Sequence, residues 1–433
     1  MRVLGIGDYN DLGSVYMQLA REGHEVRVHI AEEGSRDVLA GLLTRTEDWS
    51  AELPWVREAG ADGLIVFEEV GRGGVQDQLR RDGFHVLGGS TYGDRLEQDR
   101  AFGQQVLADI GMSTLATREF ESHEAGKAFI QREPRRYVLK FNGSGLTSDM
   151  NYVGVRADGA DVVAALRRHE LTLHPDHHEA TSFVLMDHVQ GIETGLGAFF
   201  DGRQFVGPVN LDWEHKRFFP GDLGELTGEM GTVVTYRRGE KLFEATLAKL
   251  APRLREANHV GYINLNTIIN DQGIWPLELT CRFGYPGFAI LSALFAEPRG
   301  PMLARIARGE GGAIQTHDGY AVGVVLTVPP FPYHHGYDEI SKGLPILFGD
   351  LEDEERANVH YGEVELAGET LVTAGQIGYV MVVTGRGATI EDAQRAAYAL
   401  AAKITIPNVR YRNDIGDALR ARGLAELTRL GWL

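Results

Sequence analysis

The chain has 433 residues, 43% hydrophobic and 24% charged, which is the composition of a folded protein with about two to four domains or subdomains. Its 61 acidic and 43 basic residues give a formal charge of −18, which argues against nucleic acid or an anionic membrane as a partner. The single cysteine, Cys281, excludes an intrachain disulfide framework. Without a leader peptide or a run of about 18 apolar residues, we expect a cytoplasmic protein that does not enter the membrane.

The first 93 residues alternate short apolar strands with helical segments, a pattern typical of a parallel α/β layer. We expect strands at Arg2–Gly7, Val26–Ile30, Gly63–Phe67 and Val86–Leu87, and a helix at Leu12–Glu22. The turn after the first strand is rich in glycine but also carries aspartates, so it is weak evidence for a dinucleotide site.

The middle of the chain predicts a larger mixed α/β body, with a boundary near residue 94. Residues 212–231 are polar and glycine-rich, and their length as a loop without secondary structure favours a binding role. Beyond Tyr320 we expect a separate mixed domain with a helix at Ile390–Lys403. In the body we expect helices at Asp94–Ile110 and Lys241–Asn258, strands at Tyr137–Phe141 and Ser182–Val189, and a hairpin of Gly195–Phe200 with Gln204–Val209.

The segment that begins at Pro276 carries the clearest chemical pattern. Alternation with period two places Glu278, Thr280 and Arg282 on one face of an extended strand. Asn264 and Asn266 come from the preceding strand and add two amide oxygens. Oxygen ligands beside a guanidinium suit a magnesium nucleotide, with Mg²⁺ or Mn²⁺ as the metal. An ordinary strand edge with surface charges is the other interpretation of this stretch.

Two further segments predict nucleotide contacts. Lys140 ends a strand and is followed by the glycine turn 142–145, where a lysine can contact phosphates. The connector after the strand ending near Val189 can offer backbone groups to adenine, with Asp187 nearby and Glu193 accepting from ribose hydroxyls. A surface lysine and an exposed acidic connector are the corresponding structural alternatives.

Taken together, these motifs resemble the ATP-grasp carboxylate–amine ligases, and among them the glycinamide ribonucleotide synthetases (phosphoribosylamine–glycine ligases), over most of the chain. The matching motifs are Arg95–Phe102, Tyr137–Lys140, Gly191 with Glu193, His215–Arg217, Gly221–Asp222, Thr227–Gly231, Glu278–Gly284, Val359–Gly362, Val383–Thr384, Ile390–Gln394 and Tyr411–Gly416.

The resemblance implies an ATP-grasp fold: an N-terminal α/β domain at 1–93, an ATP-grasp domain at 94–320 with a lid at about 113–187, and a mixed C-terminal domain at 321–433. It implies that ATP phosphorylates a carboxylate and that an amine attacks the acyl phosphate. Lys140 and Arg282 are then the candidate catalytic residues. Arg100, a lysine in the family, joins the ATP contacts.

The same resemblance assigns substrate binding to the segment 212–231. The small-molecule acid and amine would be held by Arg282 together with Lys216, Arg217, Asp222, Thr227 and Gly228. Glycine is the expected acid. The oligomeric state cannot be inferred from these patterns.

The chain departs from the family at several places. Thr280 replaces a metal-binding asparagine, and the phosphate-covering loop lacks its glycine-lysine-glycine end. Asp8–Asp11 and Glu68–Gly74 replace turns that in the family would hold phosphoribosylamine, and their acids are unfavourable near a phosphate. We therefore expect a divergent amine site. A catalytically silent relative that binds a nucleotide or metabolite is the alternative, although Lys140, Glu278 and Arg282 oppose it.

Overall fold

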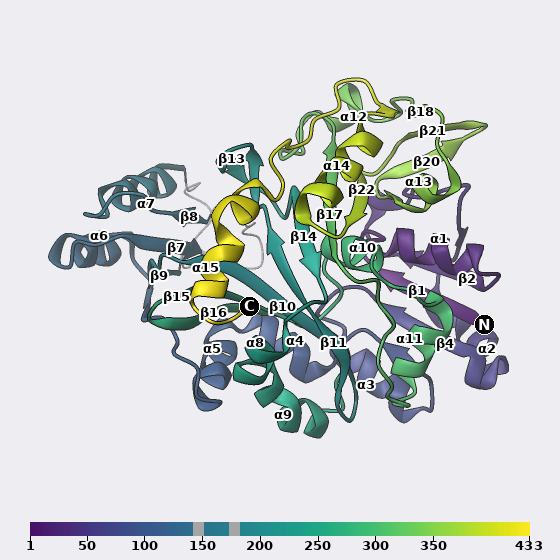
Figure 1. Ribbon diagram of the computed structural model, residues 1–433, viewed down its shortest axis with the longest axis horizontal. Coiled ribbons are helices and arrows are strands. Elements are labelled where there is room, and N and C mark those ends of the chain that lie inside the picture. Colours follow the sequence, from purple (N-terminus) through teal and green to yellow (C-terminus); the bar gives the residue numbers. More distant parts are fainter. Residues whose placement is uncertain (142–150, 173–181) are drawn as a thin grey trace.

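The structure, a computed structural model, describes residues 1–141, 151–172 and 182–433 (Figure 1). The expected mixed α/β architecture is confirmed, with a parallel N-terminal sheet beside a large antiparallel sheet. In Figure 1 the purple N-terminal layer lies to the right, the large sheet crosses the centre, and a smaller α/β unit projects to the left.

The N-terminal layer is a five-stranded parallel sheet in the order β3-β2-β1-β4-β5. Strand order reverses direction between β1 and β4, so the carboxyl ends of these two strands form a topological switch point. Five successive residues of β1 are buried, as expected for a strand covered on both faces. The elements are β1 (Arg2–Gly7), α1 (Gly13–Arg21), β2 (Glu25–Ile30), β3 (Thr44–Arg45), α2 (Leu53–Glu58), β4 (Gly63–Phe67), α3 (Gly73–Arg81) and β5 (Val86–Leu87).

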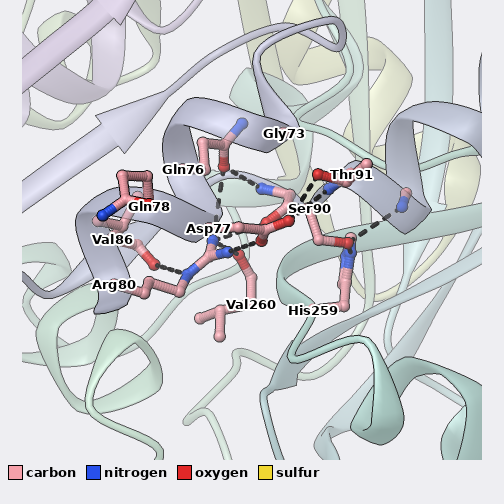
Figure 2. Close-up of polar contacts among 12 residues, drawn as sticks. Gly73, Gln76, Asp77, Gln78, Arg80, Val86, Ser90, Thr91, His259 and Val260 are labelled. Atoms are coloured by element: carbon pink, nitrogen blue, oxygen red, sulfur yellow. Dashed lines mark hydrogen bonds and ion pairs between the residues drawn. The ribbon is translucent and has the colours of Figure 1, made fainter. Parts of the chain in front are cut away.

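A buried polar joint fastens this layer to the central sheet (Figure 2). The guanidinium of Arg80 donates to the carbonyls of Gly89 at 2.6 Å and Val260 at 3.2 Å, so it ties the end of the N-terminal layer to the large sheet. Ser90 Oγ and His259 Nδ1 lie 3.0 Å apart, and both residues are fully buried. The pair is therefore part of the joint and has no access to a substrate.

The prediction of one continuous helix at Asp94–Ile110 is wrong. The structure has α4 (Thr91–Gln98) and α5 (Arg100–Asp109), with a break at Asp99. The carboxylate of Asp99 accepts from the backbone N–H of Phe102 at 3.0 Å and so caps the second helix.

The central sheet has eight antiparallel strands in the order β16-β15-β10-β11-β14-β17-β22-β19. The boundary expected at residue 320 falls between two paired strands, because Thr235 of β14 lies opposite Tyr320 of β17. One hydrophobic core also includes Leu265, Val324 and Val383 from both sides of that boundary. The strands are β10 (Ile192–Asp201), β11 (Phe205–Glu214), β14 (Gly231–Thr235), β15 (Val260–Asn270), β16 (Gly273–Thr280), β17 (Tyr320–Thr327), β19 (Val359–Tyr361) and β22 (Tyr379–Gly387).

The projecting unit, called the lid below, has its own four-stranded sheet in the order β6-β9-β7-β8 and its own core around Phe129, Leu166 and Phe183. Its helices α6 and α7 lie at the far left of Figure 1. The elements are β6 (Thr117–Phe120), α6 (His123–Arg132), β7 (Tyr137–Phe141), β8 (Tyr152–Val153), α7 (Ala160–Thr172) and β9 (Phe183–Asp187).

The prediction that residues 212–231 form a loop without secondary structure is wrong. It finishes strand β11 and then forms a hairpin of β12 (Arg217–Phe219) and β13 (Leu223–Leu226). The helix expected at Lys241–Asn258 is also interrupted, because Thr246 adopts φ −132° and ψ −95°, outside the helical region. The described residues contain no helix long and apolar enough to cross a membrane.

The remaining elements are α8 (Glu240–Ala245), α9 (Ala251–Glu256), α10 (Gly287–Ser292), α11 (Arg299–Ala307), α12 (Tyr337–Ile340), β18 (Leu347–Phe348), α13 (Asp353–Ala357), β20 (Val364–Ala367), β21 (Thr370–Thr373), α14 (Ile390–Ala401), β23 (Ile404–Thr405) and α15 (Leu424–Arg429).

Candidate active site

Lys216 stands at the centre of a group of three carboxylates, just past the end of β11. Its Nζ lies 3.0 Å from Glu214 Oε2, 3.2 Å from Glu193 Oε1 and 3.7 Å from Glu278 Oε1. Burial alone would lower the pKa of Lys216, but the carboxylates of Glu214, Glu193 and Glu278 outweigh it and raise this pKa well above its ordinary value. The ammonium is therefore permanently charged and holds three acids from three strands together.

Lys140 approaches the same group from the lid. Its Nζ lies 3.8 Å from Glu278 Oε2, so Glu278 is placed between two ammonium groups. Burial would raise the pKa of Glu278, but Lys216, Lys140 and Arg100 lower it below its usual range. Glu278 is thus an ionised carboxylate at neutral pH, as a metal ligand requires.

The two asparagines predicted as metal ligands lie beside Glu278 on the neighbouring strand. Asn266 is directly opposite Glu278, and Asn264 is directly opposite Thr280, so these side chains share one face of the sheet. Asn264 donates from Nδ2 to Asp212 Oδ2 at 2.8 Å, whereas its Oδ1 is buried and has no hydrogen-bond partner within the described part of the chain.

This donor set fits a magnesium ion. It offers one carboxylate and amide oxygens, and Mg²⁺ commonly takes one or two carboxylates and completes its shell with phosphates and water. No group of three or more His, Cys, Asp or Glu side chains in the described ranges is arranged to hold a metal by itself.

Arg282 lines the same pocket as Glu278 and is oriented by Glu97. Its Nε donates to Glu97 Oε1 at 3.1 Å, and the backbone N–H of Cys281 donates to Glu97 Oε2 at 2.7 Å. A pocket of about 200 Å³ opens here. Four predicted site residues line this pocket together, namely Arg100, Glu278, Thr280 and Arg282.

The hairpin places its predicted substrate residues differently from each other. Thr227 closes the base of the hairpin, with its N–H and hydroxyl both donating to the carbonyl of Lys216 at 2.8 and 2.9 Å. Arg217 donates to Gly224 O at 2.6 Å, and Asp222 pairs with the buried Arg412 at 2.9 Å. Gly228 lies near the hydroxyl of Tyr379, which a Cβ at this position would approach to 3.3 Å.

In the structure, Arg217 and Asp222 therefore fix the hairpin, while Lys216 is the hairpin residue that joins the carboxylate group. The remaining predicted nucleotide residues lie between the lid and the central sheet. Asp187 ends strand β9 and pairs with Arg135 at 3.1 Å, whereas Val189 lies half-buried in the connector to β10. The glycine turn 142–145 lies outside the described residues.

Two residues that hold the site together were missed in the sequence. Glu214 had a usable signal, since it precedes Lys216 by two positions at the end of a strand and so shares its face. Glu97 lies within the matching motif Arg95–Phe102, but no local pattern indicated its contact with Arg282, which joins residues 185 positions apart.

Comparisons with known proteins show which family the chain resembles. Residues 98–288 match the ATP-grasp (A) domain of phosphoribosylglycinamide synthetase, and residues 321–418 match the C domain of the same family. The chain is 25% identical to a phosphoribosylamine–glycine ligase of Halalkalibacterium halodurans, over 99% of this chain and 100% of the relative. It is 27% identical to the Corynebacterium ammoniagenes protein of the same name, over 96% of this chain and 98% of the relative.

Solved structures share the fold. A phosphoribosylamine–glycine ligase from Thermotoga maritima superposes with a TM-score of 0.70 at 23% identity, covering 96% of this chain and all of the other. A biotin carboxylase from Campylobacter jejuni gives a TM-score of 0.62 at 10% identity, covering 97% of this chain and 95% of the other. The architecture is thus shared with proteins that are very distant in sequence.

Proposed function

Because the chain belongs to the phosphoribosylglycinamide synthetase family of ATP-grasp proteins, we propose that it is an ADP-forming ligase that joins a small carboxylate to an amine. In this reaction a carboxylate oxygen attacks the terminal phosphorus of ATP and ADP leaves. The amine nitrogen then attacks the acyl phosphate, loses a proton and displaces inorganic phosphate, which gives an amide.

The observation that carries this proposal is the meeting of Lys140, Glu278 and Lys216. The ammonium groups of a lid lysine and a hairpin lysine each lie within 4 Å of one sheet carboxylate, an arrangement that suits phosphoryl transfer between a covered nucleotide and a bound acid. Lys140 and Arg282 stabilise the phosphoryl group during its transfer by their fixed positive charge.

The proposed metal site lies on the face of the sheet that Glu278 and Asn266 share. Glu278 and Asn266 would hold Mg²⁺, with Thr280 and Asn264 beside them on the two strands. When bound, the metal supplies charge neutralisation to the phosphate oxygens of ATP. The protein's own task is to keep Glu278 ionised, which the two flanking lysines do.

The nucleotide would extend from this centre toward the connector between lid and sheet. Arg100 faces the phosphate side of the pocket, and Glu193 is placed to accept from ribose hydroxyls while it also pairs with Lys216 at 3.2 Å. Asp187 and the backbone of Val189 belong to the adenine end in this proposal.

The acid substrate would lie against Lys216 and Arg282, within the space bordered by Thr227 and Gly228. Glycine is the proposed acid, since it is the acid named in the relatives. Arg217 and Asp222 contribute by holding the hairpin in place.

The test separates ligase chemistry from the identity of the amine. Purified protein with Mg²⁺-ATP and glycine is assayed for ADP release, with hydroxylamine as a small trapping amine and, separately, with freshly generated phosphoribosylamine. We expect glycine-dependent ADP release together with glycine hydroxamate, and neither product with Glu278→Gln. ATP binding without ADP release under these conditions, across a panel of amino acids, would replace the ligase proposal with a binding function.

A further inference from the structure

Four acidic side chains gather at the switch point of the N-terminal sheet. Asp8 and Asp11 belong to the turn after β1, and Glu68 and Glu69 follow β4 directly. The two turns are joined by hydrogen bonds: the N–H of Asp8 donates to Glu69 Oε1 at 2.8 Å, and that of Leu12 to Glu68 Oε2 at 3.4 Å. Open α/β sheets bind their ligands at this position.

Three guanidinium groups face these acids in the described part of the chain, and one of them, that of Arg45, acts electrostatically on Glu68. Arg72 pairs with Asp8 and with Glu69, and Arg282 approaches from the central sheet while it is paired with Glu97. Burial raises the pKa of Glu69 to about 8 and that of Asp11 to about 6, although Arg282 opposes the shift at Asp11. At pH 7 Glu69 is therefore largely protonated and Asp11 largely ionised, so neutral carboxyl groups and carboxylates lie together in these turns.

Buried polar atoms in the same turns lack partners, which is an independent sign of a ligand. Glu68 is 1% exposed, and its carboxyl group is hydrogen-bonded by the buried hydroxyl of Tyr16. Asn10 stands between the two aspartates with φ +69° and is 4% exposed, yet neither its Oδ1 nor its Nδ2 is hydrogen-bonded within the described ranges. Native structures rarely leave such groups unsatisfied without a functional reason.

These turns interact electrostatically with the candidate active site through Arg282. Arg282 lies between them and Glu278, since it lines the same pocket as Glu278 and acts electrostatically on Asp11 and Glu69. Tyr285 is a further neighbour of the turns, since burial and then the charge of Asp11 raise its pKa. A ligand held by the acids would therefore extend toward the centre where the acyl phosphate forms.

We propose that the second substrate is an amine that carries an additional positive charge and no phosphate, bound by Asp11, Glu68 and Glu69. This inference rests on the proposed ligase function and specifies its amine. The cationic end pairs with these carboxylates and donates to the unpartnered Oδ1 of Asn10, and the reacting amine points past Arg282 toward the acyl phosphate. A phosphorylated amine would instead bring its charge against the carboxylates.

The test measures binding directly, so that it does not depend on turnover. The full chain, saturated with Mg²⁺-ADP, is titrated by calorimetry with 1,4-diaminobutane and with O-phosphoethanolamine. We expect the diamine to bind at least about 10-fold more tightly, and Glu69→Gln and Asp11→Asn each to weaken it by about 10-fold or more. Glu58→Gln, an exposed acid of the same domain, is the matched control and should leave diamine binding unchanged.

Protonated carboxyl groups must release protons when they bind a dication. Titrations of the wild-type chain in two buffers of different ionisation enthalpy should therefore show net proton release at pH 7. The inference is overturned if O-phosphoethanolamine binds as tightly as the diamine, if the diamine does not bind, or if Glu69→Gln and Glu58→Gln behave alike. Hydroxamate formation without diamine binding would overturn this inference alone, whereas diamine binding without ADP release would overturn the ligase proposal alone.

Discussion

Lys140 Nζ and Glu278 Oε2 lie 3.8 Å apart, although the lysine belongs to the lid sheet and the glutamate to the edge strand of the central sheet. Glu278 is also within 3.7 Å of Lys216, so one carboxylate receives charge from the lid and from the hairpin. Because the side chain of Glu278 is 42% exposed, water screens these pairs and they contribute little stability. Their consequence is positional: three separate elements are held around one small volume.

Replacing Glu278 by glutamine should remove the carboxylate that we propose as a metal ligand without changing the shape of the side chain. We expect kcat for ADP release to fall by about 100-fold or more, since a preorganised charge at the transferring phosphoryl group is lost. Steady-state ADP release with glycine and hydroxylamine measures this. The exposed Glu244→Gln on α8 is the control, and equal rates in the two variants would remove Glu278 from the proposed centre.

Replacing Lys216 by alanine should impair use of the acid substrate. The ammonium neutralises Glu193, Glu214 and Glu278, and its loss leaves three carboxylates facing an incoming carboxylate. We expect the KM for glycine to rise by about 10-fold to 100-fold, the range of one lost hydrogen bond to a charged group. Lys216→Arg should recover part of the loss. An unchanged KM in the alanine variant would place the acid elsewhere.

Local sequence patterns predicted the short strands well. Gly63–Phe67, Val86–Leu87 and Tyr137–Phe141 have the predicted bounds, because each is a largely apolar run followed by polar or glycine-rich sequence. Interruptions inside helices were harder. The break at Asp99 depends on a side chain that caps a new helix, and hydrophobic periodicity continues across it.

Contacts between distant segments were beyond these patterns. Tyr320 begins a strand that pairs with Thr235, so the C-terminal part extends the central sheet, and nothing near either residue indicates the pairing. The same holds in the site. Glu278 and Arg282 were predicted from alternation along one strand, although β16 ends at Thr280 and Arg282 lies beyond it. The approach of Lys216 to Glu278 depends on the order of four strands and a hairpin.

The acids of the N-terminal turns predict a dependence of stability on pH. The pKa of Glu69 is about 8 in the folded chain, against an ordinary value of 4.5. Between these pH values the folded state binds more protons than the unfolded state, so its stability falls as the pH rises. Glu69→Gln removes that loss, and its Tm should exceed that of the wild type by roughly 2–4 °C at pH 8.5 but not at pH 4.5.

Thermal unfolding at pH 4.5, 6.5 and 8.5 checks this, with Glu58→Gln as a surface control. The gain should increase up to about pH 8 and then level off. A constant difference at all three pH values would show that Glu69 titrates normally in the folded protein.

We predict that the buried side chain of Arg412 holds the hairpin in place. Its side chain is 1% exposed and donates to Asp222 Oδ1 at 2.9 Å, to the carbonyl of Arg217 at 3.0 Å and to Asp414 at 2.8 Å. Arg412→Met should lower the free energy of unfolding by about 3 kcal/mol, because it leaves partly buried acceptors without a donor. Asp222→Asn is the matched control: Asp222 is 71% exposed, so its loss should be below about 1 kcal/mol. Urea denaturation followed by tryptophan fluorescence measures both.

Since the hairpin carries Lys216, the KM for glycine should rise in Arg412→Met and stay near wild type in Asp222→Asn. Equal effects of the two variants on stability and KM would show that the buried guanidinium does not hold the hairpin.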